Sequence, residues 1–86
     1  MFALAITKRC QKQIADLCAH DAKLEERLRE TLQEVQNDPF RTGRKLKGYT
    51  DYIRARVDYR HRLVYRVVDR AVIVFEFNTR DNISYG

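Results

Sequence analysis

The stretch from Asp51 to Val57 alternates apolar and basic side chains, and this alternation constrains the fold more than any other feature of the chain. Its apolar members are Ile53, Ala55 and Val57, and its basic members are Arg54 and Arg56. Because successive side chains of a β-strand point to opposite faces, the pattern predicts a strand with one buried face and one charged face. Another layer of the chain must therefore cover the apolar face.

Two amphipathic helices in the first half of the chain can supply that layer. Thr7 is a candidate N-cap for a helix from Lys8 to about Ala19, and Asp21 is one for a second helix that stops before Pro39. Apolar residues recur at helical spacing in both, at Cys10, Ile14, Leu17 and Cys18 and then at Leu24, Leu28, Leu32 and Val35. A short turn between them makes a helical hairpin.

The remaining apolar runs predict three more strands. These are Phe2–Ile6, Leu63–Val68 and Ala71–Phe77, with Asp69 and Arg70 as a tight turn between the last two. The residues from Arg41 to Thr50 read as a basic loop, and those from Thr79 to Gly86 as a polar tail. We therefore expect one domain over residues 1–86, of the α+β class and with the order β-α-α-β-β-β. The helical hairpin should pack on one face of a small, mainly antiparallel sheet.

Positive charge gathers on the opposite face of that sheet. Residues 1–39 carry six Lys/Arg and seven Asp/Glu, whereas residues 40–86 carry eleven and five. The first half reads as scaffold and the second as a surface for nucleic acid or an acidic protein. Four tyrosines, Tyr49, Tyr52, Tyr59 and Tyr65, interleave with the basic residues. Arginine suits phosphate and tyrosine can stack on a base, although a solvated strand face with ordinary aromatic packing would give the same pattern.

Other chemistries have little support in the sequence. The two histidines, His20 and His61, are far apart, and no His, Cys, Asp and Glu cluster has ligand spacing, so we expect no metal and no cofactor. Cys10 and Cys18 read as two buried, reduced thiols. No apolar run approaches the ~20 residues of a membrane-spanning helix, and a cytoplasmic location follows by default.

The charged face becomes a site only if the strands pair in the right register. Arg56 and Arg62 share a face if they pair directly, which leaves residues 58–60 as the loop. If the two guanidinium groups lay on opposite faces, no common site would exist.

Several motifs resemble the RelE/ParE superfamily of bacterial toxins. They are DPFRTGRKLKGYTDYIRARV, HRLVYRVVD and VIVFEFNTRDNISY, which together cover most of the chain. The resemblance implies a RelE/ParE-like fold and the toxin of a type II toxin–antitoxin system. For the RelE-like branch it implies a metal-free endoribonuclease that cuts mRNA in the ribosomal A site by attack of a 2′-hydroxyl.

Carried over onto this sequence, the resemblance implies a catalytic set. The set consists of Arg54, Arg56, Arg62, Arg80 and Tyr85. In RelE the two residues that correspond to Arg54 and Arg56 are lysines. Arginine, unlike lysine, hardly gives up its proton. The glutamate base of YoeB-type members has no match between Phe40 and Tyr49. Tyr85 can be the base if neighbouring cations lower its pKa from about 10.

Partners and alternatives follow from the same resemblance. Arg44, Lys45, Lys47, Arg60 and His61 are expected to hold RNA or a cognate antitoxin, with mRNA and the ribosome as further partners and no membrane. One alternative is a ParE-type toxin that inhibits DNA gyrase by protein contact. The other is an RNA-binding module that cuts nothing.

Overall fold

The computed structural model describes residues 1–46 and 49–84. Its elements are β1 (Ala3–Ile6), α1 (Lys8–Cys18), α2 (Ala22–Asn37), α3 (Pro39–Thr42), β2 (Arg44–Leu46), β3 (Tyr49–Arg56), β4 (His61–Val68), β5 (Ala71–Thr79) and a 3-10 turn, η1 (Arg80–Asn82). The five strands form one sheet in the order β1-β5-β4-β3-β2, in which only β1 and β5 are parallel among the described pairs. The predicted α+β fold and its element order are confirmed, with α3 and β2 as additions. No helix within the described ranges has the length and apolar character needed to cross a membrane.

Both long helices begin at the predicted caps. The Thr7 hydroxyl accepts a hydrogen bond from the Cys10 N–H at 3.2 Å, and the Asp21 carboxylate accepts one from the Leu24 N–H at 3.0 Å. Each bond satisfies one of the amide groups that the first turn of a helix leaves without a partner. Asp38 ends α2, since its backbone leaves the helical region at φ −152° and ψ 83° after its N–H makes the last bond, to the Glu34 carbonyl oxygen.

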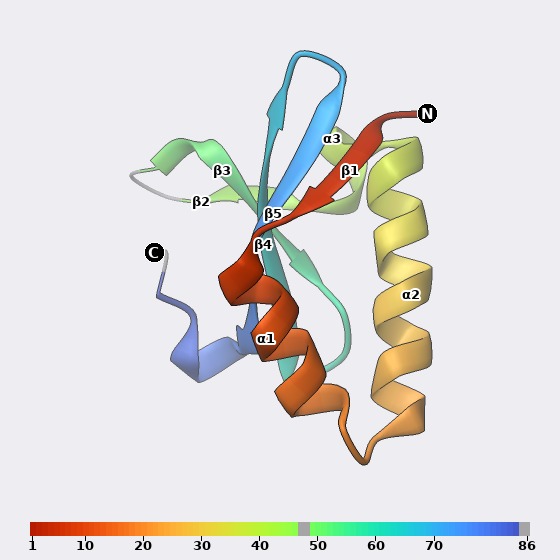
Figure 1. The fold of residues 1–86 in the computed structure, drawn as a ribbon. Helices are drawn as coiled ribbons and strands as arrows, with labels where there is room; N and C mark the ends of the chain where they lie inside the picture. The colour runs from red at the N-terminus through yellow and green to blue at the C-terminus, as the bar shows by residue number, and fades with distance from the viewer. Residues whose placement is uncertain (47–48, 85–86) are drawn as a thin grey trace.

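The core lies between the helical hairpin and one face of the sheet. Ile53, Ala55 and Val57 are buried there as predicted, beside residues of α1, α2, β4 and β5 that include Cys10, Leu28, Leu63 and Phe77. Burying a large apolar side chain of this kind stabilises the fold by about 1.5–3 kcal/mol. Cys18 is only half-buried, so the prediction of two buried thiols is wrong for it, although both cysteines are free. Figure 1 shows α2 and the C-terminal segment on opposite sides of the sheet.

The predicted loop from Arg41 to Thr50 is wrong in part. The Asp38 side chain caps α3 by accepting from the Arg41 N–H, with Pro39 at the first helical position, where its missing N–H costs nothing. The chain then forms β2, which pairs with β3 so that Arg44 lies opposite Arg54. The cap and the pairing partner both lie outside the local pattern of basic residues, which is why that pattern indicated a loop.

The two hairpins fix which side chains face the helices. Arg56 pairs directly with Arg62, and the Val57 N–H donates to the His61 carbonyl oxygen at 3.0 Å, as the predicted register requires. The turn at Asp69 and Arg70 is also confirmed, with Asp69 at a φ of 56° in place of the usual glycine.

A bulge in β5 changes the face on which its later residues lie. Val64 pairs with Glu76 and Tyr65 with Val74, so Phe75 is an extra residue on the β5 side. Without it, strict alternation would put Glu76 on the same face as Val72 and Val74, toward the helices. The bulge therefore sends Phe77 into the core and turns Glu76 to the other face of the sheet.

Gly43 allows β2 to approach the sheet closely. A Cβ atom at this position would lie 2.6 Å from Ile53 Cγ2, 2.8 Å from the Tyr65 hydroxyl oxygen and 2.9 Å from the Arg54 carbonyl oxygen. We predict that Gly43→Ala lowers the free energy of unfolding by about 1–3 kcal/mol, because two of these contacts are with buried side chains and the third is with backbone. Urea unfolding measures this.

The neighbouring substitution Arg44→Ala is the matched control. The Arg44 side chain is exposed and lies opposite Arg54, so its removal should not lower the free energy of unfolding. Equal effects from the two substitutions would contradict the close approach at Gly43.

Candidate anion-binding site

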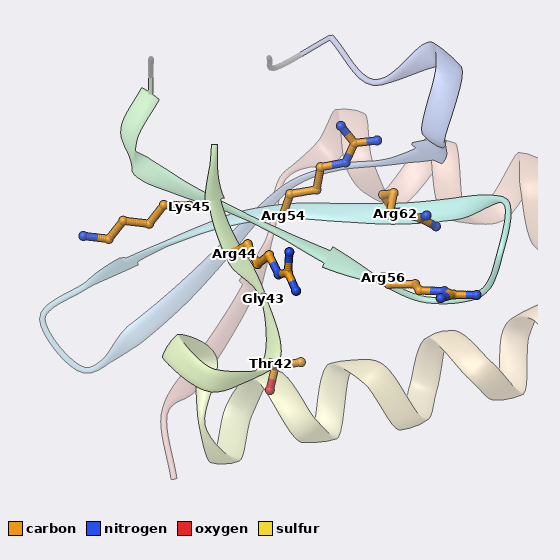
Figure 2. Close-up of a pocket in the computed structure, with 7 residues that line it drawn as sticks. All are labelled: Thr42, Gly43, Arg44, Lys45, Arg54, Arg56 and Arg62. Carbon is orange, nitrogen blue, oxygen red and sulfur yellow. The ribbon is translucent and has the colours of Figure 1, made fainter. Parts of the chain in front are cut away.

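A cleft of about 500 Å³ opens on the face of the sheet that the helices leave uncovered. It is lined by Thr42, Gly43, Arg44, Lys45, Arg54, Arg56 and Arg62, from the end of α3 and from β2, β3 and β4. Figure 2 shows these residues and the strands that carry them. Thr42 and Arg62 are 20 positions apart in the sequence, and both line the cleft because β3 lies between β2 and β4.

In two places an arginine on one strand lies directly opposite an arginine on the neighbouring strand. Arg44 pairs with Arg54, and Arg56 pairs with Arg62. Like charges at opposed positions destabilise a sheet. Within the described ranges, none of these four guanidinium groups forms an ion pair with a carboxylate. The cleft therefore concentrates positive charge that the described residues do not neutralise, which is the property of an anion-binding site.

Arg62 is the most constrained cation of the cleft. Its Nη1 donates to the carbonyl oxygens of Asp58 at 2.6 Å and His61 at 3.0 Å, which fixes the guanidinium beside the β3–β4 loop. Partial burial lowers the pKa of Arg62 most, and the nearby charges of Arg54, Arg56 and Arg80 lower it further. Arginine keeps its proton even so, and an anion in the cleft would relieve this repulsion.

Arg80 joins the cleft through its backbone more than through its side chain. The Arg54 Nη2 donates to the Arg80 carbonyl oxygen at 3.1 Å, and the Arg80 N–H donates to the Arg60 carbonyl oxygen at 2.7 Å. Arg80 also lines a second cleft, of about 530 Å³, together with Tyr59, Arg60, Thr79, Asp81 and Asn82. The structure thus brings three of the predicted catalytic arginines together and puts the fourth next to them.

The predicted binding residues are placed less uniformly. Arg44 lies in the cleft, but the Lys45 side chain points away from the arginines (Figure 2). His61 ends on the other face of the sheet, where its ring stacks on Phe77 with the centroids 5.6 Å apart. Two further predicted residues, Lys47 and Tyr85, lie outside the described residues.

The four arginines that line the cleft can bind and stabilise negative charge, but they do not move protons. Guanidinium groups present fixed, charge-assisted donors to phosphate oxygens and stay charged. His61 is occupied in the hairpin, since its Nδ1 lies 3.0 Å from Asp58 Oδ1. No three His, Cys, Asp or Glu side chains of the described chain form a group that could hold a metal ion. Burial, followed by the charge of Glu76, raises the pKa of Cys10 to about 12, which disfavours its reactive thiolate.

Sequence reasoning missed the residues that support the arginines. Thr42 and Gly43 line the cleft, and Asp58 organises the loop beside Arg62. Tyr65 holds α3 against the sheet, because its buried hydroxyl donates to the Pro39 carbonyl oxygen at 2.5 Å. An acid in the apolar run AVIVFEF was a visible signal that Glu76 has a polar partner.

Comparison with known proteins identifies the family. Residues 3–83 match the family described as the ParE toxin of type II toxin-antitoxin systems, parDE. The match spans most of the chain, so the protein belongs to this family and is a type II toxin of the RelE/ParE superfamily. A comparison with curated proteins found no match.

Solved structures of toxins have the same fold. A YoeB/ParE toxin from Agrobacterium tumefaciens is 22% identical, with a TM-score of 0.80 over 91% of this chain and 98% of its own. A chain of the intact RelBE toxin–antitoxin complex from E. coli is 26% identical, with a TM-score of 0.76 over 91% of this chain and 95% of its own. A chain of the E. coli DinJ–YafQ complex is 14% identical, with a TM-score of 0.77 over 98% and 99%.

Asp58 gives the β3–β4 loop a pH-dependent stability. Its Oδ1 accepts from the backbone N–H groups of Arg60 at 2.8 Å and His61 at 2.7 Å. Burial pushes its pKa up, but these hydrogen bonds and the His61 ring outweigh that effect, so the pKa lies below the ordinary value. The resulting stabilisation is complete above the pKa of the unfolded carboxyl, about 3.9, and is lost as the pH falls through the lower pKa of the folded state.

We predict that Asp58→Asn is less stable than the parent at pH 5 and that the difference narrows as the pH falls from 4 to 2.5. Asparagine keeps an acceptor oxygen but loses the charge, so only the parent loses this contribution in acid. Urea unfolding across this range measures both curves. A gap that stays constant with pH would contradict the assigned role of the Asp58 carboxylate.

Proposed function

We propose that the protein is an endoribonuclease toxin that cleaves mRNA in the ribosomal A site by attack of a 2′-hydroxyl on the adjacent phosphorus. The observation that carries the proposal is the pair of opposed arginine couples, Arg44 with Arg54 and Arg56 with Arg62, in one cleft without a described acid among them. The resemblance to RelE-type toxins supplies the reaction class, and the cleft supplies the charge that such a reaction needs.

The cleft matches the electrostatic demand of the reaction. As the 2′-oxygen attacks, the phosphorus becomes five-coordinate and its oxygens gain negative charge. Preorganised cations stabilise that charge without reorganising. Arg54, Arg56 and Arg62 share one sheet face, and hydrogen bonds to main-chain carbonyls hold the guanidinium groups of Arg54 and Arg62, so the positions of these two are set before RNA binds.

The protons require groups beyond the cleft lining. The bond from phosphorus to the 5′-oxygen breaks, which leaves a 2′,3′-cyclic phosphate on one fragment and a 5′-hydroxyl on the other. A base accepts the 2′-hydroxyl proton, and the departing 5′-oxygen takes a proton from water. We assign the base to Tyr85. The arginines hold charge and do not donate the second proton.

The same charged face is the proposed surface for an antitoxin. The RelBE and DinJ–YafQ structures are complexes of this kind. A partner that covers the cleft would place acidic groups beside the arginines and would compete directly with RNA.

One observation favours a second function. The matched family is named for ParE, and the four arginines among the described cleft residues hold charge without moving protons. A ParE-type toxin that inhibits DNA gyrase through protein contact would use the charged face for docking. RNA binding without cleavage is a third possible outcome.

The three functions separate when the toxin is induced in cells that lack an antitoxin. We predict cuts within translated messages for the parent. Arg62→Ala should lower the cleavage rate by about 100-fold, because one fixed cation of the cleft is lost. Arg70→Ala is the matched control, since Arg70 is an exposed arginine in the β4–β5 turn and should leave cleavage unchanged.

Mapping of message ends and measurement of DNA synthesis decide among the outcomes. Cuts with 5′-hydroxyl ends that depend on Arg62 support the proposal. Arrested replication with intact messages would point to gyrase. Growth arrest with neither effect, together with RNA binding by the purified protein, would indicate a module that cuts nothing.

A further inference from the structure

The C-terminal segment is tied to the sheet by a buried carboxylate. Glu76 is fully buried, and its two carboxylate oxygens face Ser84. Oε1 accepts from the Ser84 N–H at 2.7 Å, and Oε2 accepts from the Ser84 hydroxyl at 3.0 Å. A buried charge is stable only when it is paired and hydrogen-bonded, so this contact is specific and not incidental.

Arg9 of α1 completes the cluster. Its Nη2 lies 3.3 Å from Glu76 Oε2 and donates to the Ser84 hydroxyl at 3.1 Å. The Arg9 side chain is half exposed, so the ion pair alone is a weak reason for burying a carboxylate there. The buried Glu76 carboxylate is better explained by its hydrogen bonds to Ser84, which is the last described residue of the chain.

The β5 bulge is what makes this cluster possible. It turns Glu76 away from the helices and toward the face that carries the arginine cleft. The segment 80–84 is also held at its beginning, in η1, where Asn82 Nδ2 donates to the Thr79 hydroxyl at 2.8 Å. The segment 80–84 is therefore fixed at both ends, by η1 and by Glu76.

This fixed segment contacts the cleft. The Arg80 carbonyl oxygen, within the segment, accepts the hydrogen bond from Arg54 Nη2. A segment released at Ser84 would leave that acceptor less fixed and Arg54 freer to move.

We propose that Arg9, Glu76 and Ser84 form a clamp that positions the segment 80–84 for RNA cleavage, so that Glu76 is a positioning residue for Arg54. The inference rests on the proposed function. Glu76 does not touch RNA in this account, because it is completely covered. It acts by restricting the conformations of the segment whose Arg80 carbonyl oxygen holds the Arg54 guanidinium.

The test compares Glu76→Gln with the parent in cleavage of mRNA on programmed ribosomes. Glutamine keeps the size of the side chain but loses the charge that holds Arg9. We expect the single-turnover rate at saturating ribosomes to fall by about tenfold or more, because misplacement of reacting groups costs rate. The half-saturating ribosome concentration should change by less than about twofold, since the cleft arginines that bind phosphate remain. Glu26→Gln, an exposed site on α2, is the control for loss of an acid and should match the parent.

Ser84 provides a rescue that a purely structural role would not show. Ser84→Ala removes the hydroxyl that bonds Glu76 and Arg9, and it should lower the rate without changing thermal stability, since Ser84 is exposed. Ser84→Thr keeps a hydroxyl and should restore the rate to within about twofold of the parent. Equal rates for the parent, Glu76→Gln and Ser84→Ala would overturn the clamp, as would a change confined to the half-saturating concentration.

A second readout separates failure of the clamp from failure of the proposed function. Hydrogen exchange at the Ser84 amide requires no RNA. Slow exchange in the parent and fast exchange in Glu76→Gln supports the clamp as a structural element. If exchange follows this pattern but the parent does not cleave RNA, the proposed function and the positioning role both fail. If the parent cleaves RNA and the Ser84 amide exchanges equally fast in both proteins, only the clamp fails.

Discussion

The pairing register of β3 and β4 is the constraint on which the site depends. Arg56 and Arg62 share a face because they are direct partners in the antiparallel ladder. A slip by one residue would move the arginines of β3 to the helix side and Ile53 and Ala55 to the charged side. Burial of those apolar residues against the helices therefore holds the arginines in place as well, and the core and the site have a common cause.

The register brings an electrostatic cost with it. Opposed arginines repel, and the described residues do not place a carboxylate between them. Main-chain carbonyls of Asp58, His61 and Arg80 hold two of the guanidinium groups without neutralising them. A chain of 86 residues has a thin core with which to offset this repulsion. Binding of a polyanion or of an acidic partner then stabilises the fold as well as filling the site.

Local patterns in the sequence were sufficient for most of the fold. The caps at Thr7 and Asp21, the helical stripes and the alternation in β3 each depend on neighbouring residues, and each was predicted correctly. Two short elements were missed, because α3 is stabilised by the Asp38 cap and Tyr65, and β2 by its pairing with β3. The Tyr65 and β3 contacts come from residues that are distant in the sequence. The Asp38 cap is local, but α3 is too short to show a helical period of apolar residues.

The site was harder to predict than the fold. Charge patterning pointed to Arg54, Arg56 and Arg62, and the structure brings these three together. It could not separate Arg44, which pairs with Arg54, from Lys45, whose side chain points away from the arginines, because that depends on the pairing of an unpredicted strand. The role of Glu76 depends on a bulge, and a single extra residue leaves no periodic signal in a short strand.

The most direct test of the central claim is a phosphate titration followed through the arginine side-chain Nε–H signals by NMR. If the β3–β4 register builds one anion site, the signals of Arg54, Arg56 and Arg62 should shift together and fit a single dissociation constant. The signals of Arg29 on α2 and Arg70 in the β4–β5 turn should not move. Three separate dissociation constants, or equal shifts at Arg29 and Arg70, would contradict the account.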